Sequence, residues 1–61
     1  MLRPGVLVTL LSGGPVMTVK KVSPEGNWVD AQWFDLVSGT FKVQSFDVGT
    51  LAMIRHIRLE V

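Results

Sequence analysis

The chain has 61 residues, no cysteine and one histidine, and its formal net charge is +1 at pH 7. This length allows one domain, and the residue counts exclude disulfide bonds, cysteine-ligated zinc and histidine-rich metal sites. A near-neutral charge gives no strong attraction toward nucleic acid. Because 48% of the residues are hydrophobic and only 18% are charged, we expect some apolar surface to be covered by a partner.

The N-terminal residues do not form a basic stretch followed by an apolar core, so no secretory signal is predicted. No apolar run approaches the ~20 residues that a membrane-spanning helix needs. The sequence therefore predicts a soluble, cytoplasmic protein that does not enter a membrane.

Five apolar runs alternate with turn residues at short intervals, which is typical of a small all-β domain. The first run covers residues 6–11 and is followed by Ser-Gly-Gly-Pro at 12–15. The second covers 16–22. The Ser-Pro-Glu-Gly segment at 23–26 predicts a turn, because proline presets φ and glycine tolerates a positive φ.

The third run, residues 28–34, alternates in polarity, so its side chains divide between two faces of a strand. One face contains Asp30 and Gln32, which are costly to bury without partners. We therefore predict that this polar face meets solvent and that the opposite face packs in the core. The predicted core residues are Val29, Ala31 and Trp33, and the predicted outward residues are Trp28, Asp30, Gln32 and Phe34.

The rest of the chain predicts two further strands. Residues 35–40 form a hairpin loop, 41–46 a fourth strand, and 47–50 a single 3₁₀ turn that tucks Leu51 into the core. The last run, 53–61, alternates as a closing strand would, although a helix matches it in part. Together these elements predict a five-stranded SH3-like barrel that spans residues 1–61 as one domain.

Three segments carry a family resemblance. They are Ser-Gly-Gly-Pro-Val-Met-Thr-Val at 12–19, Trp-Val-Asp-Ala-Gln-Trp-Phe-Asp at 28–35, and Ser45-Phe46 with Leu51 beyond. Together they resemble the YodC-like family of small bacterial and phage proteins over nearly the whole chain. That family is uncharacterised, so the resemblance implies a fold and no activity. Ala31 departs from it, because relatives often have cysteine there.

A second resemblance concerns residues 23–26 and 43–51, which are similar to the type B, plasmid-borne dihydrofolate reductases. Those enzymes are SH3-like barrels that form a tetramer around a pore. Val43 and Gln44 match the start of their Val-Gln-Ile-Tyr pore motif, and the next two residues depart from it. The basic pore residue of that family has no clear counterpart here. The resemblance implies a pore-type reductase as one alternative function.

Two aromatic residues on the outward face of the third run suggest a contact surface, since aromatic side chains concentrate at interfaces. We predict a non-enzymatic interaction module that binds a protein, including a second copy of itself, through Trp28, Gln32 and Phe34. Lys42 and Gln44 on the fourth strand are further candidate binding residues. No cofactor, metal or catalytic group is predicted, because the lone His56 has no nucleophile near it in the sequence.

A nucleic-acid-binding barrel is the other alternative. Such barrels combine aromatic stacking with a basic groove. Asp30 on the aromatic face opposes this function, because a phosphate backbone needs positive charge there. Nucleic-acid binding also requires the cationic side chains to converge on one surface. These are Lys20, Lys21, Lys42, Arg55 and Arg58.

Overall fold

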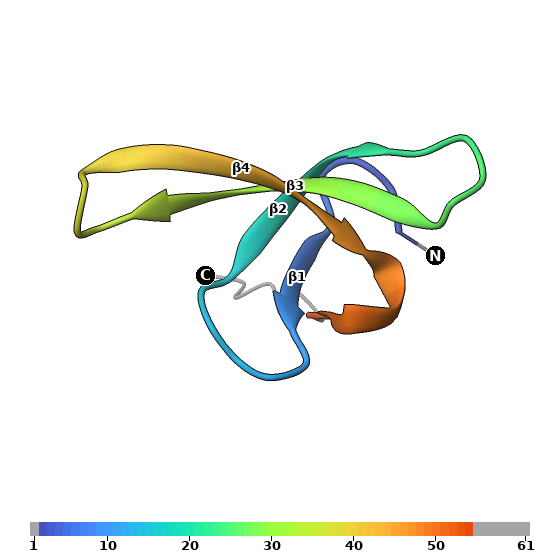
Figure 1. The fold of residues 1–61 in the computed structure, drawn as a ribbon, viewed down its shortest axis with the longest axis horizontal. Coiled ribbons are helices and arrows are strands. Elements are labelled where there is room, and N and C mark those ends of the chain that lie inside the picture. The colour runs from blue at the N-terminus through green and yellow to red at the C-terminus, as the bar shows by residue number, and fades with distance from the viewer. Residues whose placement is uncertain (1, 55–61) are drawn as a thin grey trace, which may run out of the picture.

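A computed structural model of the chain describes residues 2–54 as one antiparallel sheet with strand order β4-β3-β2-β1-β5 (Figure 1). This confirms the all-β prediction and the 3₁₀ turn, η1, before the last strand. The elements are β1 (Leu7–Leu10), β2 (Met17–Val22), β3 (Trp28–Asp35), β4 (Thr40–Asp47), η1 (Val48–Thr50) and β5 (Leu51–Met53).

The last strand differs from its prediction. It begins at Leu51, directly after η1, and pairs with β1 through Leu10, Thr9 and Val8. Most of the predicted closing strand, residues 55–61, lies outside the described residues. Within residues 2–54 the sheet is not closed into a barrel, because β4 and β5 form its two edges.

The turns lie where proline and glycine were expected to place them. Gly26 has a φ of 77°, and its N–H donates to the Ser23 carbonyl at 2.9 Å. The Ser23 hydroxyl then accepts from the N–H groups of Asn27 and Trp28, each at 3.1 Å. Gly14, between β1 and β2, has a φ of 130°, a backbone angle that residues other than glycine rarely adopt.

The buried core is small and lies where β1, β2 and β3 meet. It consists of Val8, Met17, Val19, Val29 and Ala31. Val29 and Ala31 confirm the predicted inward face of β3. Trp33 is only half-buried, although it packs against this core together with Phe46 and Leu51.

The β3–β4 hairpin reaches beyond this core. Figure 1 shows its far half projecting as an arm, with no other strand above or below it in the picture. Its eight cross-strand pairs run without a register shift from Trp28↔Asp47 to Asp35↔Thr40. The arm therefore holds its shape through strand pairing and carries its side chains away from the five core residues.

A β-bulge interrupts the pairing of β2 with β3 between Val19 and Lys21. A bulge adds one residue to a strand and changes the direction of the side chains there. As a result Lys20 and Lys21, although consecutive, are both exposed, whereas Val19 is buried.

Candidate interaction surface

The solvent-facing side of the sheet, called the outer face below, is set by strand register. Directly opposed residues in an antiparallel pair share a face. Trp28, Gln32 and Phe34 point away from the core residues Val29 and Ala31, as predicted. The outer face consists of Thr18 and Lys21 on β2, Trp28, Asp30, Gln32 and Phe34 on β3, and Phe41, Val43, Ser45 and Asp47 on β4.

The end of the outer face near the hairpin loop is apolar. The rings of Phe34 and Phe41 lie edge to face, with centroids 5.1 Å apart. Val16 joins these rings in lining one shallow hollow, and Val43 is the next outer-face residue on β4. We call Val16, Phe34, Phe41 and Val43 the distal patch. All four are exposed, Phe41 to 65%.

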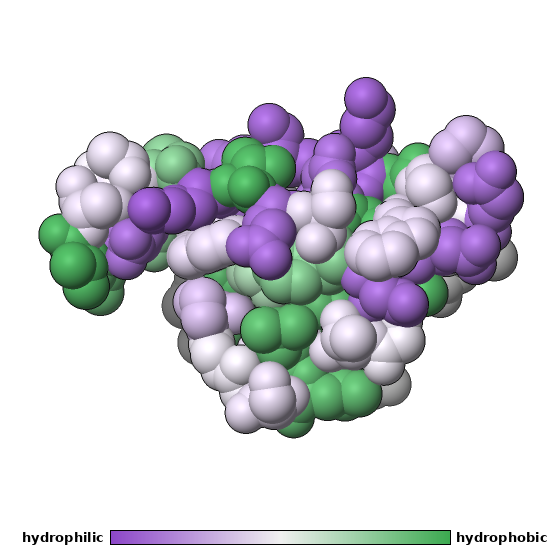
Figure 2. All heavy atoms as spheres, viewed as in Figure 1, coloured by the Kyte–Doolittle hydropathy of each residue, from purple (hydrophilic) through white to green (hydrophobic). Residues whose placement is uncertain are grey.

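The tip of the arm extends this apolar surface. Leu36 and Val37 follow β3 directly and are 86% and 97% exposed. Figure 2 shows apolar side chains at the free end of the hairpin, beside polar ones along its length. Large apolar side chains are therefore concentrated on the part of the sheet that lies farthest from the core.

The middle of the outer face is polar and carries both signs of charge. Gln32 is half-buried between Thr18 and Val43. Asp30 accepts a hydrogen bond from the Ser45 hydroxyl and lies opposite Lys21. A phosphate backbone laid across this region would meet a carboxylate between the cations, which opposes binding.

Trp28 is half-exposed, at 52%, but it lies far from the distal patch. It begins β3 and Phe34 almost ends it, so at about 3.3 Å per residue they are about 20 Å apart. Trp28 instead lines a surface groove with Leu10, Leu11 and Phe46, between β4 and the β1–β2 loop. The two aromatic residues predicted from sequence therefore share a face without forming one contact.

Lys42 and Gln44 lie on the other side of the arm. Their cross-strand partners are Trp33 and Ala31, on the core-facing side of β3. The structure thus brings Gln32 and Phe34 together and separates them from Lys42 and Gln44. For the same reason Val43 and Gln44, the pair shared with the reductase motif, point to opposite faces of β4.

Phe41 and Val43 are members of the patch that sequence reasoning did not select. A signal was present, because a hairpin that turns through residues 35–40 brings 34 opposite 41 and 32 opposite 43. That pairing places both β4 residues on the face already assigned to Phe34 and Gln32.

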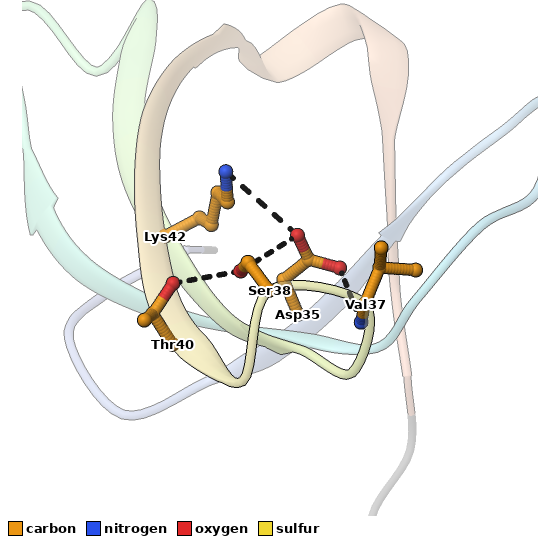
Figure 3. A network of polar contacts seen from close by, with 5 residues as sticks. All are labelled: Asp35, Val37, Ser38, Thr40 and Lys42. Atoms are coloured by element: carbon orange, nitrogen blue, oxygen red, sulfur yellow. Dashed lines mark hydrogen bonds and ion pairs between the residues drawn. The ribbon is translucent and has the colours of Figure 1, made fainter.

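Asp35 organises the loop at the tip of the arm (Figure 3). Its carboxylate accepts from the Ser38 hydroxyl at 3.0 Å and from the Val37 N–H at 3.2 Å, and Lys42 Nζ lies 3.7 Å away. The Ser38 hydrogen bond, aided by the Val37 N–H and Lys42, lowers the pKa of Asp35, although desolvation opposes them. The loop is therefore held by a charged carboxylate, which leaves Leu36 and Val37 facing outward.

We expect acid to release this loop. Because the pKa of Asp35 is lower in the folded state, its contribution is complete above the unfolded pKa and disappears as the pH falls through the folded pKa. The Val37 amide should therefore lose protection from hydrogen exchange, and shift in NMR spectra, as Asp35 is protonated. Asp35→Asn should show the acid-like Val37 resonance already at neutral pH. A Val37 amide that does not respond to acid contradicts this role.

The described residues can be compared with the ligand sets that hold metal ions. Within residues 2–54 no group of three or more His, Cys, Asp or Glu is placed to hold a metal ion. His56, Arg55 and Arg58 lie outside the described part of the chain. None of the described elements is a helix long and apolar enough to cross a membrane.

Comparison with known protein families gives a match over most of the chain. Residues 3–51, from before β1 to the start of β5, match the family described as uncharacterized small protein (DUF2158). Neither the curated proteins nor the solved structures contain a match to the chain. The match covers all of β1 to β4, including both strands of the arm. The chain therefore belongs to the DUF2158 family of uncharacterised small proteins.

Proposed function

We propose that this chain is a non-enzymatic interaction module that associates with a second copy of itself through the distal patch. The observation that carries this proposal is the exposure of Phe34, Phe41 and Val43 on an arm that projects from a core of five residues. We further propose that the fold is of the SH3-like class and that the family is the YodC-like one. The position of β5 beside β1, reached through a 3₁₀ turn, supports the fold class.

The distal patch has the chemistry of a protein contact. Burial of apolar surface contributes roughly 25 cal/mol per Å², and aromatic residues are frequent among the side chains that dominate binding energy. Within residues 2–54 the rings of Phe34 and Phe41 contact each other and line one hollow with Val16 on this face. A second copy offers the same apolar surface, so the apolar side chains of the two patches can contact each other.

The test is the concentration dependence of molecular mass, measured by analytical ultracentrifugation or light scattering. We expect the wild type to dimerise and the double variant Phe34→Ala/Phe41→Ala to weaken dimerisation at least tenfold, which corresponds to ~1.4 kcal/mol. Met53→Ala is the matched control, because Met53 is 52% exposed on β5, at the opposite edge of the sheet. A wild type that stays monomeric at high concentration contradicts the proposal.

Nucleic-acid binding is the alternative that the exposed pair Lys20 and Lys21 at the β2 bulge would favour, but it is not the function that we propose. Lys42, however, lies on the core-facing side of the arm and pairs with Asp35. We expect no retention of DNA or RNA in a filter-binding assay at ~50 mM salt, where electrostatic binding is strongest. For the pore-type reductase, we expect no NADPH consumption with dihydrofolate at high protein concentration.

A further inference from the structure

The two edges of the sheet differ in how well they can accept another strand. Among the described residues, β5 is a short edge of three residues, whereas β4 is an edge of eight. β4 contains no proline or glycine, and its pairing with β3 has no bulge. Natural edge strands are usually shortened, bulged or heavily charged, because a long regular edge is a template for another strand. β4 has only Lys42 and the terminal Asp47 as charged residues.

The direction of the backbone groups on β4 follows from one backbone hydrogen bond just beyond the strand and from the antiparallel alternation. The Val48 N–H donates to the Asn27 carbonyl at 2.9 Å, so Val48 faces β3. Backbone groups alternate in direction along a strand, so Phe46, Gln44 and Lys42 also direct their N–H and C=O toward β3. The backbone groups of Phe41, Val43 and Ser45 therefore point to the open edge. The same residues carry their side chains on the outer face.

We propose that β4 pairs antiparallel with β4 of a second copy, about a two-fold axis at Val43, to form one continuous sheet of ten strands. The inference rests on the proposed self-association and specifies its geometry. Val43 pairs with the partner's Val43, and Phe41 pairs with the partner's Ser45 on each side of the axis. Within residues 2–54 the N–H and C=O groups of these residues have no strand partner, so every one of their bonds can form in the proposed pair.

Side chains select this register over its neighbours. An axis at Val43 places Lys42 opposite the partner's Gln44, and it brings Phe41 diagonal to the partner's Val43 on the outer face. An axis at Lys42 would set two ammonium groups directly opposite each other, which is destabilising. An axis at Gln44 would place Phe41 opposite the carboxylate of the partner's Asp47. Of these three registers, the Val43 register joins the two distal patches without opposing like charges and without setting an aromatic ring against a carboxylate.

The same register gives the hairpin tip a contact. Gly39 lies opposite the partner's Asp47, so the hairpin loop lies beside the end of the partner's β4. The groove lined by Leu10, Leu11 and Trp28 opens at that end. A stable interface covers about 800 Å² on each partner, and the two hairpin loops add area to that of the paired strands.

Cysteine cross-linking tests the register directly, because the chain has no cysteine of its own. Opposed residues of an antiparallel pair have Cα atoms about 4.5–5.5 Å apart, within the range of a disulfide. Val43→Cys should therefore form a disulfide-linked dimer on mild oxidation. Gln44→Cys alone and Lys42→Cys alone should not, but a mixture of the two should yield the mixed dimer. Cross-linking of Gln44→Cys alone, without Val43→Cys, would overturn the register.

A backbone variant separates edge pairing from contact through the side chains alone. Val43→Pro removes an N–H that faces the open edge and leaves the β3–β4 ladder intact, as proline on an edge strand permits. We expect it to fold, by circular dichroism, and to sediment as a monomer. A Val43→Pro protein that is folded and still dimeric, with no cross-linking in any cysteine variant, refutes edge pairing but leaves self-association in place. A monomeric wild type refutes both.

Discussion

Replacing Trp33 with alanine is expected to lower the free energy of unfolding by about 2–4 kcal/mol. A fully buried Trp→Ala change costs about 3–5 kcal/mol, and Trp33 is half-buried, so the expected value lies somewhat lower. Its ring packs against the core, 6.2 Å from the Phe46 ring. Because a core of this size supplies only about 3–5 kcal/mol, a large fraction of the variant should be unfolded at 25 °C.

The measurement is urea denaturation followed by circular dichroism. Dilute protein should be used, because dimerisation would add its own stability. Trp33→Phe is the matched control, since it keeps an aromatic ring against Phe46 and should cost clearly less. A Trp33→Ala protein that melts like the wild type would show that the arm, and not this ring, limits stability. Equal losses for the two variants would show that the indole itself is required.

Local features of this fold could be predicted from sequence because their causes are local. The turn at 23–26 follows from proline and glycine, and the two faces of β3 follow from its alternation of polarity. The bulge at Lys20–Lys21 could not be predicted, because it depends on how β2 meets β3. The start of β5 at Leu51 also escaped prediction, because it is fixed by pairing with β1, about forty residues earlier.

The residues of the candidate surface could likewise be predicted from the sequence only in part. Trp28, Gln32 and Phe34 were placed on the correct face by alternation alone. Lys42 and Gln44 were grouped with them, but their side is decided by the register of the hairpin, which depends on the loop and not on β4 itself. The position of β4 at an edge of the described sheet is even harder to predict from the sequence. Which backbone groups are unpaired is known only when the strand order of the whole sheet is known.

The neighbours Trp28 and Val29 provide the sharpest test of the two faces, because the smaller side chain should matter more. Val29 is 1% exposed and lies in the core, opposite Phe46. Val29→Ala removes two buried methyl groups and should cost about 2–3 kcal/mol. Trp28→Ala removes a far larger side chain from an exposed position and should cost less than about 1 kcal/mol.

Both variants should be compared with the wild type by urea denaturation under identical dilute conditions. An unchanged m-value with a lower midpoint for Val29→Ala would show that stability, and not compactness, was lost. If Trp28→Ala proved the more damaging change, the faces of β3 would be reversed. Phe34 and Phe41 would then be core residues, and the distal patch could not be a surface for a partner. Which of the two variants, Val29→Ala or Trp28→Ala, loses more unfolding free energy therefore decides whether the arm presents its aromatic residues to another molecule.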